Sequence, residues 1–483
     1  MYLGLDLGTS GLRGLLVSED GTVVGDATKS YDVQSPKSGW AEQDPAVWVG
    51  ACLSVLSKLA ASFPAEYRAL KGIGVAGHMH GATVLDHSGK VIRPCILWND
   101  TRAAKEAAEL DETPGFRELS GNIVFPGFTA PKLLWMARNE PENYALVSKV
   151  LLPKDYLVFW LTGEISSEMS DASGTSWLNV ETRTWSEILI NGSGMRRDQL
   201  PDVVEGCDVV GQLSVERAQQ IGLSTDVSVV AGAADNAAAA CGVGAFEEGQ
   251  GFVSLGTSGV ILAAKDRYAP DPSTAVHTFC HAMPMKWYQM GVILSATDSL
   301  NWMADNLGHS PEELADLLPD KPGGPGVVRF LPYLSGERTP HNDANARGAF
   351  LGLSRGSDQA ALVQAVMEGV SFALRDCLEA LHSTGTNLGS VLVIGGGSKS
   401  AFWVQTLANT LGIALHLPAK GDFGAAMGAA RLAMIGAGGL SPQEVMVPAA
   451  IEVEIKPDRV LTDAYDASYR AYKQTYEAIK DLP

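Results

Sequence analysis

The sequence predicts an α/β protein built from two related domains that share a central cleft. Its 483 residues exceed what a single hydrophobic core usually organises. Segments with strand patterns and segments with helix patterns alternate in both halves of the chain. The hexapeptide DLGTSG at residues 6–11 returns as SLGTSG at residues 254–259, each time between two apolar segments. The repeat predicts one domain over residues 1–244 and a second over residues 245–483.

The elements around the first hexapeptide read as a strand, a tight turn and a second strand. Residues 2–5 and 12–17 are apolar, and glycine and hydroxyl residues separate them. The pair Asp20-Gly21 is a strong hairpin signal and leads into a third short strand. This arrangement predicts that the chain begins inside an antiparallel part of a mixed sheet.

Further along the chain, buried strands lead into polar or glycine-rich turns. Residues 227–231 form an apolar strand pattern, and residues 391–394 form another that ends in three glycines. Helical periodicity covers residues 45–59, where proline suits the first helical position, and residues 360–381. Both halves therefore combine strands that end near small residues with amphipathic helices.

Composition and charge exclude several classes of protein. The formal net charge is −19, from 36 basic and 55 acidic residues, so the basic surface that a nucleic-acid binder needs is absent. The six cysteines are scattered without a C-x-x-C pair, which is typical of buried thiols in a reducing compartment. No leader segment or membrane-length apolar run is visible, so a cytoplasmic protein without membrane contact is expected. The oligomeric state is not determined by the sequence, and a homodimer is one alternative.

The two Gly-Thr-Ser-Gly turns are suited to binding a polyphosphate. Glycines let the backbone come close to a ligand, and successive N–H groups with two hydroxyls can face phosphate oxygens. In the first turn the candidate phosphate contacts are Thr9 and Ser10, and in the second they are Gly256 and Thr257. Asp6 would repel a phosphate, so its predicted role is to bind Mg²⁺ through the hydration shell of the ion. Neither turn matches the phosphate-binding P-loop or the dinucleotide fingerprint.

Asp235 is the candidate general base. It follows an apolar strand and the turn at residues 232–234, and it precedes an alanine-rich helix start. Position alone favours a helix N-cap, which is the common use of Asp at such a place. Three features favour chemistry: ligands bind at strand ends in α/β proteins, the neighbouring side chains are very small, and the second glycine turn is close in sequence. A carboxylate there can take the proton of a ligand hydroxyl.

Two polar segments of the first half are candidates for binding a polyhydroxyl ligand. One contains His80, which can hydrogen-bond to hydroxyls, and Met79, which can pack against a carbon skeleton. For the neighbouring His78 a structural role is preferred. The other segment ends an apolar strand with Asp100, which could accept hydroxyl protons, pair with Arg102 or cap the following helix.

These residues resemble the FGGY carbohydrate kinases, and within that family the branch that acts on xylulose, over essentially the whole chain. Residues 128–135 and 348–369 are similar to the two family signatures. Further similar motifs are WAEQDP at residues 40–45, GHMHG at 77–81, LLPKDYL at 151–157, SDASGTSWL at 170–178 and LPYLSGERTPH at 331–341.

The resemblance implies two actin-like ATPase (ribonuclease-H-like) domains, with ATP and Mg²⁺ meeting a sugar in the cleft. It implies transfer of the γ-phosphoryl group of ATP to O5 of D-xylulose. Asp235 would be the base, and the sugar contacts would be Met79, His80, Asp100 and Asn236. Gly396 and Gly397 would border the nucleotide, and the turn at residues 421–426, which includes Gly424, would form part of the adenosine pocket.

Some features stay open at this level. The pair of alanines at residues 233–234 departs from the glycine that relatives often carry there, and Lys132 in the first signature has no assigned role. The same family includes kinases for L-ribulose, sugar alcohols, glycerol or gluconate, which are alternatives for the substrate. An actin-like protein that binds ATP as a switch without catalysis is the alternative from another class.

Overall fold

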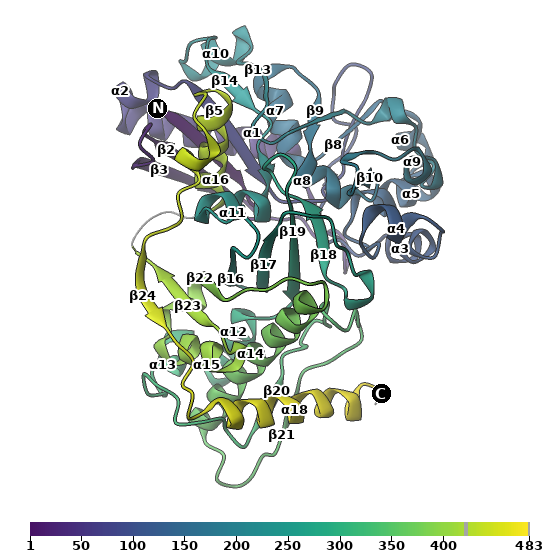
Figure 1. Cartoon of the computed structure of the whole chain (residues 1–483). Helices are drawn as coiled ribbons and strands as arrows, with labels where there is room; N and C mark the ends of the chain where they lie inside the picture. Colours follow the sequence, from purple (N-terminus) through teal and green to yellow (C-terminus); the bar gives the residue numbers. More distant parts are fainter. Residues whose placement is uncertain (420–423, 482–483) are drawn as a thin grey trace.

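The computed structural model describes residues 1–419 and 424–481, and it shows two α/β domains stacked one above the other (Figure 1). The described part of the N-terminal domain contains a seven-stranded mixed sheet with the order β13-β14-β5-β1-β2-β3, and β15 also pairs with β5. Its strands are β1 (Tyr2–Leu7), β2 (Gly11–Val17), β3 (Val23–Ser30), β5 (Gly72–Gly77), β13 (Val209–Gln212), β14 (Ser228–Val230) and β15 (Ala233–Ala234).

The C-terminal domain repeats this plan. Its seven-stranded sheet has the order β18-β19-β17-β16-β22-β23-β24. The strands are β16 (Gly251–Leu255), β17 (Gly259–Lys265), β18 (His277–Cys280), β19 (Trp287–Ile293), β22 (Ser390–Ile394), β23 (Ala414–Pro418) and β24 (Ile451–Ile455). β1 is antiparallel to β2 and parallel to β5, and β16 is likewise antiparallel to β17 and parallel to β22. The repeated hexapeptide therefore marks the same turn in two related sheets.

Helices cover these sheets, and short two-stranded sheets lie outside them. In the first half of the chain the helices are α1 (Pro45–Ser62), α2 (Pro64–Arg68), α3 (Ala104–Asp111), α4 (Phe116–Ser120), α5 (Thr129–Asn139), α6 (Pro141–Ala145), α7 (Pro153–Thr162), α8 (Met169–Ala172), α9 (Glu187–Gly192), α10 (Val215–Ile221) and α11 (Asp235–Val243). The short sheets there pair β4 (Glu42–Gln43) with β7 (Cys95–Ile96), β6 (Thr83–Leu85) with β8 (Lys149–Leu151), β9 (Ser166–Glu168) with β12 (Asp202–Val204), and β10 (Leu178–Asn179) with β11 (Thr184–Trp185).

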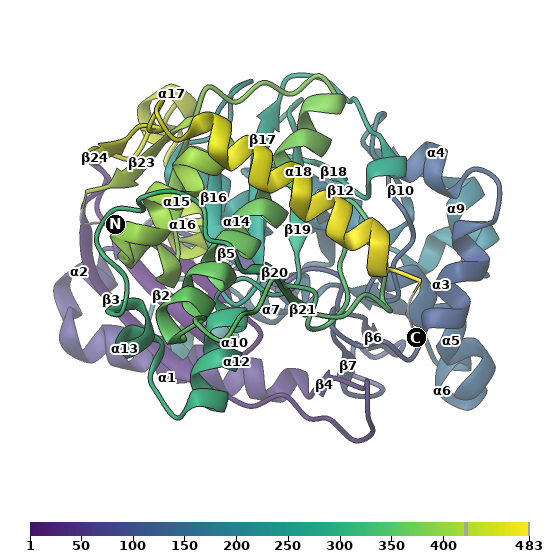
Figure 2. The ribbon, with the colours of Figure 1, turned by 90° about the horizontal axis from the view of Figure 1, so that it is seen from below.

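In the second half the helices are α12 (Thr297–Leu307), α13 (Pro311–Ala315), α14 (Gln359–Ser383), α15 (Ala401–Leu411), α16 (Ala425–Gly436), α17 (Pro442–Val445) and α18 (Thr462–Ile479). A short sheet pairs β20 (Arg329–Leu331) with β21 (Ala349–Leu351). Figure 2 shows α18 crossing the C-terminal domain. The side chains of Tyr465, Tyr469 and Tyr472 on α18 are buried in the hydrophobic core of that domain, which explains how this late helix is held.

Helix α16 connects the two domains. Although it comes late in the sequence, it packs against β1, β5 and α11 of the N-terminal domain (Figure 1). The helix comes this close because glycines stand where its backbone meets the backbone of the other elements. A Cβ added at Gly4 would lie 1.8 Å from the carbonyl oxygen of Ala426. A Cβ added at Gly428 would lie 1.8 Å from the carbonyl oxygen of Ala238. A division of the chain at residue 244 stays a prediction, and α16 shows that the second part completes the packing of the first.

Helix α1 is the one helix of the described residues that is long and apolar enough to cross a membrane, judged by length and composition only. Its residues Trp48, Val55 and Leu59 are buried in the core beneath β2 and β3. Core helices of globular proteins pass the same test, so this helix is weak evidence for a membrane span. All six cysteines are free thiols, and five of them are buried, in line with the expectation from their spacing.

Candidate active site

Strand register brings three polar segments to one edge of the N-terminal sheet. Leu7 at the end of β1 pairs with Gly77 at the end of β5, and Gly77 in turn pairs with Ala234 of β15. All three strands run in the same direction. The first glycine turn, the His78–His80 segment and Asp235 therefore leave the sheet side by side, at the carboxyl edge where α/β proteins bind ligands.

Asp235 is the first residue of α11, and the N-cap position belongs to Ala234. The N-cap alternative for Asp235 is therefore wrong. Its Oδ1 atom accepts two hydrogen bonds from Asn236, one from the backbone N–H (2.7 Å) and one from Nδ2 (2.9 Å). Burial raises the pKa of Asp235 to about 6, against the opposing effect of these two hydrogen bonds. A carboxyl group with such a pKa is ionised at neutral pH and holds a proton more strongly than an ordinary aspartate, as a general base requires.

The His80 ring is held in a defined tautomer. Its Nδ1 lies 2.7 Å from the carbonyl oxygen of Gly174, which can only accept a hydrogen bond. Burial lowers the pKa of His80 to about 3, so the ring is neutral and carries its proton on Nδ1. Nε2 is then an acceptor, suited to a hydroxyl donor. Met79 packs beside this ring, since a Cβ added at Gly174 would lie 2.5 Å from His80 and 2.8 Å from the Met79 methyl group.

The first signature segment supports the His80 turn. His80 has a left-handed backbone conformation (φ 70°), which is uncommon for a residue other than glycine. Its carbonyl oxygen accepts hydrogen bonds from Thr129 Oγ1 (3.1 Å) and from Lys132 Nζ (2.9 Å), and its ring stacks on Phe128 at 4.4 Å. The Lys132 side chain is fully buried, and burial lowers its pKa to about 7. The structure thus gives Lys132 a contact that the sequence did not suggest: it anchors the turn that carries His80.

Asp100 and His78 are engaged within the protein. Both carboxylate oxygens of Asp100 accept hydrogen bonds from Arg102, and Oδ2 also accepts one from the backbone N–H of Ala41 (2.6 Å). The structure therefore favours the pairing alternative for Asp100, because both of its oxygens already have partners within the protein. His78 is buried and its ring lies edge-on to Trp48, in line with the structural role preferred for it.

The first glycine turn is fixed by side chains from other segments. Thr9 Oγ1 accepts a hydrogen bond from the indole of Trp98 (2.9 Å), so its own proton remains available for donation. Tyr31 donates to the Gly8 carbonyl oxygen (2.6 Å), and Ser10 is exposed beside it. These contacts hold the turn in shape and leave hydroxyl donors on its surface.

The residues fit a Mg²⁺ ion that arrives with a nucleotide. Among residues 1–419 and 424–481, no group of three or more His, Cys, Asp or Glu side chains could form a metal site by itself. Mg²⁺ is usually held by one or two carboxylates together with waters and substrate phosphates. Asp6, half-buried in β1 beside the glycine turn, can be such a single carboxylate. Its negative charge also contributes to raising the pKa of Tyr31.

The second glycine turn lies beside a cavity of about 430 Å³ in the C-terminal domain. The carbonyl oxygens of Gly256 and Thr257 accept hydrogen bonds from the N-terminal N–H groups of α12. Gly397 packs on Leu255 at the end of β16, where a Cβ would lie 2.9 Å from that of Leu255. The cavity is lined by α12, α13, α15 and the 3₁₀ turn Gly396–Lys399, with Thr297, Asn301, Gly396, Gly397 and Phe402 among its residues. The predicted nucleotide residues Gly256, Thr257, Gly396 and Gly397 thus belong to one region.

Gly424 lies elsewhere. It is the N-cap of α16 and is not among the described residues that line this cavity. Residues 421–423 of the predicted adenosine turn lie outside the described residues. Because Ala426 packs on Gly4 and Ala433 packs near Gly72, α16 runs opposite to β1 and β5, and its N-terminus points to the edge that carries Asp235. The N-terminus of a helix favours anions, so this placement is suited to phosphate rather than to the nucleoside.

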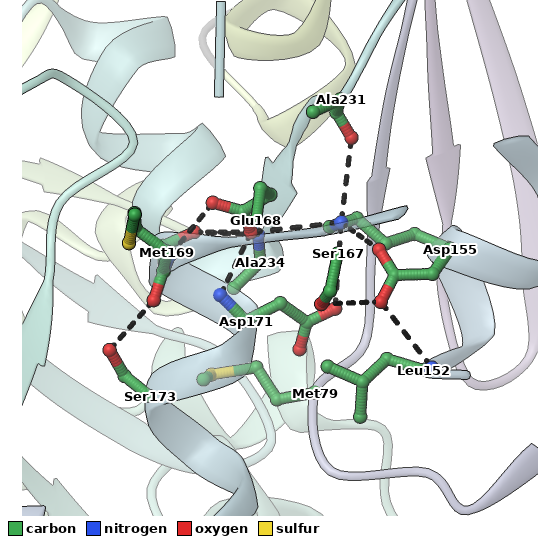
Figure 3. A network of polar contacts seen from close by, with 12 residues as sticks. Met79, Leu152, Asp155, Ser167, Glu168, Met169, Asp171, Ser173, Ala231 and Ala234 are labelled. Carbon is green, nitrogen blue, oxygen red and sulfur yellow. Dashed lines mark hydrogen bonds and ion pairs between the residues drawn. The ribbon is translucent and has the colours of Figure 1, made fainter. Parts of the chain in front are cut away.

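A buried group of charges contacts Ala231 and Ala234, in the segment that precedes Asp235 (Figure 3). Lys154 Nζ is within 4.0 Å of carboxylate oxygens of Asp155, Glu168 and Asp171, and all four side chains are buried. Lys154, Asp155 and Asp171 lie within motifs that resemble the family, whereas Glu168 lies in none of them. Charged residues within otherwise apolar segments, as in LLPKDYL, were the signal that could have identified them.

Comparisons with known proteins agree with this geometry. Residues 1–242 match the N-terminal domain, and residues 251–437 the C-terminal domain, of the FGGY family of carbohydrate kinases. A xylulose kinase of Escherichia coli (strain K12) is 44% identical over 490 residues, covering 100% of both chains. A xylulose kinase of Klebsiella pneumoniae is 42% identical over 487 residues, again covering 100% of both.

The fold has the same relatives. The crystal structure of a xyloylose kinase from Brucella ovis is 52% identical and superposes with a TM-score of 0.98 over 100% of both chains. The structure of a gluconate kinase from Lactobacillus acidophilus is 26% identical, with a TM-score of 0.93 over 100% of this chain and 98% of that one. The actin-like two-domain architecture expected from the sequence is confirmed. Twin glycine turns, a carboxylate at the sheet edge and full-length similarity together place this chain in the FGGY family of carbohydrate kinases.

Proposed function

We propose that this protein transfers the γ-phosphoryl group of ATP to O5 of D-xylulose, giving D-xylulose 5-phosphate and ADP. The observation that carries the proposal is the strand register, by which the first glycine turn, the His80 segment and Asp235 share one edge of a sheet. The full-length relatives named xylulose kinase support the choice of sugar. Phosphoryl transfer to a sugar needs phosphate-binding groups, a base and an acceptor for sugar hydroxyls close to one another.

Asp235 acts as the base. Its contacts within the described residues are made through Oδ1, so Oδ2 is the atom proposed to accept the hydroxyl proton. As that O–H bond breaks, the sugar oxygen forms a bond to the γ-phosphorus, the bond to the β-phosphate oxygen breaks, and ADP leaves. General-base assistance of this kind contributes on the order of 10²–10⁴-fold to the rate.

The remaining residues bind and orient the substrates. Nε2 of His80 accepts a sugar hydroxyl, Met79 packs on the carbon chain, and the amide of Asn236 contacts the sugar beside Asp235. The phosphates of the nucleotide are bound by residues of both domains: Thr9, Ser10, Gly256 and Thr257. The nucleoside occupies the cavity beside Gly396 and Gly397. Gly424 is assigned to the phosphates through the N-terminus of α16. Mg²⁺, bound through Asp6, would neutralise charge on the transferring phosphate.

A coupled assay of ADP release tests the proposal. The parent protein is expected to release ADP with D-xylulose, and Asp235→Asn is expected to lose at least about 100-fold in kcat while its affinity for ATP is kept. Asp226→Asn, which changes an exposed carboxylate of the same domain outside the proposed site, is the matched control and should keep kcat. Sugar-dependent ADP release by Asp235→Asn at the parental rate would refute the role of this residue.

Another sugar substrate is the second candidate. The gluconate kinase from Lactobacillus acidophilus has a similar fold, so gluconate, L-ribulose and glycerol belong in the same assay. A higher kcat/KM for one of them would move the proposal to that sugar. Sugar-independent ATP hydrolysis coupled to polymerisation would instead support an actin-like switch. A cytoplasmic location and a homodimer stay predictions, which cell fractionation and size-exclusion chromatography with light scattering would test.

A further inference from the structure

The segment that leads into Asp235 is held from two sides. On one side, Ala233 and Ala234 pair with the end of β5. On the other, Lys154 Nζ donates to the Ala231 carbonyl oxygen (3.4 Å), and the backbone N–H of Ala234 donates to Glu168 Oε1 (3.2 Å) and Ser170 Oγ (3.0 Å). The buried charges shown in Figure 3 therefore bind both ends of the four residues that precede Asp235.

Glu168 is the centre of this arrangement. Its Oε1 accepts hydrogen bonds from Ser170 Oγ, from the N–H of Asp171 and from the N–H of Ala234, and its Oε2 accepts one from the N–H of Ser170. Every one of these partners is a donor, so the site requires two acceptor atoms, which a carboxylate supplies and an amide does not. Glu168 thus joins the start of α8 to the backbone immediately before α11.

Asp171 differs from the other members of the cluster. Both of its carboxylate oxygens are buried without a hydrogen-bond partner among the described residues, and its nearest cation, Lys154, is 4.0 Å away. Asp155 bonds to Lys154 and to Ser167, and Glu168 has the four donors given above. One ammonium group cannot balance three carboxylates in a dry interior, and the carboxylate with the fewest partners is the one that takes up a proton.

The groups that face Asp171 come from four elements of the fold. They are Lys154 and Asp155 on α7, Glu168 on β9, Asp235 on α11 and Tyr288 on β19, whose hydroxyl approaches the Met79 sulfur. Burial raises the pKa of Asp171 well above its ordinary value, and the neighbouring carboxylates add to this, opposed only by Lys154. The ionised form of Asp171 is therefore disfavoured at its place beside Asp235.

We propose that the cluster of Lys154, Asp155, Glu168 and Asp171 is a positioning device for Asp235: Glu168 fixes the backbone that aims the base, and Asp171 is its neutral member. The inference rests on the proposed role of Asp235 as the base. These residues do not touch the substrate; they act through Ala231 and Ala234. A misplacement of a catalytic group by about 1 Å can cost on the order of 10²-fold in rate, so such a device has a measurable effect.

Three variants separate positioning from general stability. Glu168→Gln keeps the size of the side chain but places an amide N–H₂ opposite a donor in either orientation. Asp171→Asn reproduces a neutral acid of the same shape. Asp376→Asn is the matched control: Asp376 is a buried carboxyl of the C-terminal domain that accepts a hydrogen bond from Tyr469, away from the sheet edge that carries Asp235. For each full-length variant, kcat, the KM values for D-xylulose and ATP, the acid limb of kcat/KM and the urea midpoint are measured.

Glu168→Gln is expected to lower kcat about 10- to 100-fold with little change in the KM for ATP. Its acid limb is expected to move down from a midpoint near 6, because a loosely held Asp235 reaches more water. Asp171→Asn is expected to keep kcat within about threefold and to keep the parental midpoint, because the charge is unchanged. Asp376→Asn is expected to alter only the urea midpoint.

Two results would overturn the inference. A folded Glu168→Gln with parental kcat and acid limb would show that Glu168 does not aim the base. A folded Asp171→Asn that loses phosphoryl transfer would show that Asp171 acts as a charged or substrate-contacting group. Failure of the proposed function is recognised separately, by a parent without sugar-dependent ADP release or by an active Asp235→Asn.

Discussion

The pH dependence of catalysis should respond to a single amide beside the base. Asn236→Ala removes the Nδ2 hydrogen bond to Asp235 Oδ1 (2.9 Å) and leaves the backbone hydrogen bond of residue 236 in place. Both hydrogen bonds stabilise the ionised carboxylate, whereas burial destabilises it and holds its pKa at about 6. Without the amide the neutral acid is relatively favoured, so the pKa of Asp235 should rise.

The size of the change follows from the energy of one hydrogen bond to a charged group. Such a bond contributes about 1.5–3 kcal/mol, and one pKa unit corresponds to about 1.4 kcal/mol, so the upper limit is about 1–2 units. Asp235 is partly accessible to water, which can replace the lost donor, and we therefore expect the midpoint to move from about 6 to about 7. At pH 6.5 the ionised fraction would then fall from about three-quarters to about one-quarter.

The assay is the pH profile of kcat/KM for D-xylulose, whose acid limb reports the free enzyme. Activity needs the ionised base, so it falls as the pH decreases through the midpoint. A lower plateau at high pH would reflect the lost sugar contact and does not affect the midpoint. Asn139→Ala, which removes an exposed amide at the end of α5, is the control and should leave the profile unchanged. An acid limb of Asn236→Ala that stays at the parental midpoint or moves down would refute the assignment of Asp235 as the titrating base.

Three further predictions concern the packing and charges around the site. Lys132→Met removes the donor to the His80 carbonyl oxygen. Steady-state kinetics should show that the KM for the sugar rises about tenfold while the KM for ATP is unchanged. Equal changes in both KM values would contradict the anchoring role of Lys132. Gly428→Ala should lose at least about 3 kcal/mol of unfolding free energy in urea, because the added Cβ would collide with backbone atoms. Gly50→Ala is the control: this position on α1 has open space around it, and the variant should gain up to about 1 kcal/mol. Burial raises the pKa of Glu337 from 4.5 to about 8, so the unfolded state ionises first and the folded state loses stability as the pH rises between these values. Glu337→Gln cannot ionise, and it should therefore gain stability relative to the parent over this range and keep the gain above pH 8. A pH-independent difference in unfolding free energy would contradict this.

Local sequence patterns predicted the turns, helices and strand ends around the site, because each of these signals lies within a few residues of the chain. The repeated hexapeptide identified two equivalent turns, because the same residues recur between two apolar strands in each half of the chain. Helical periodicity over residues 45–59 and 360–381 matches α1 and α14, which continue for up to three further residues. The apolar strand before Asp235 placed that carboxylate at a strand end, as the register of β15 bears out.

Contacts between distant segments were beyond the reach of such patterns. Asp100 was a candidate sugar ligand by its position after a strand, but the side chain of Arg102 and the backbone of Ala41 take up its oxygens. Lys132 carried no local signal, since its partner is the carbonyl oxygen of His80, 52 residues earlier. A carbonyl group belongs to every residue, so the sequence contains no mark of which one a buried lysine will bind.

The sequence by itself determined the class of chemistry: two glycine turns for a polyphosphate and a carboxylate at a strand end between very small side chains. It did so because backbone approach and strand ends depend on short-range residue patterns. Only the tertiary structure decided how the base is held, through Glu168 to the N–H of Ala234, and where α16 lies, against β1 of the other domain. Both features depend on which distant segments pack together when the chain folds. Packing between distant segments has no characteristic residue spacing that could be recognised in the sequence.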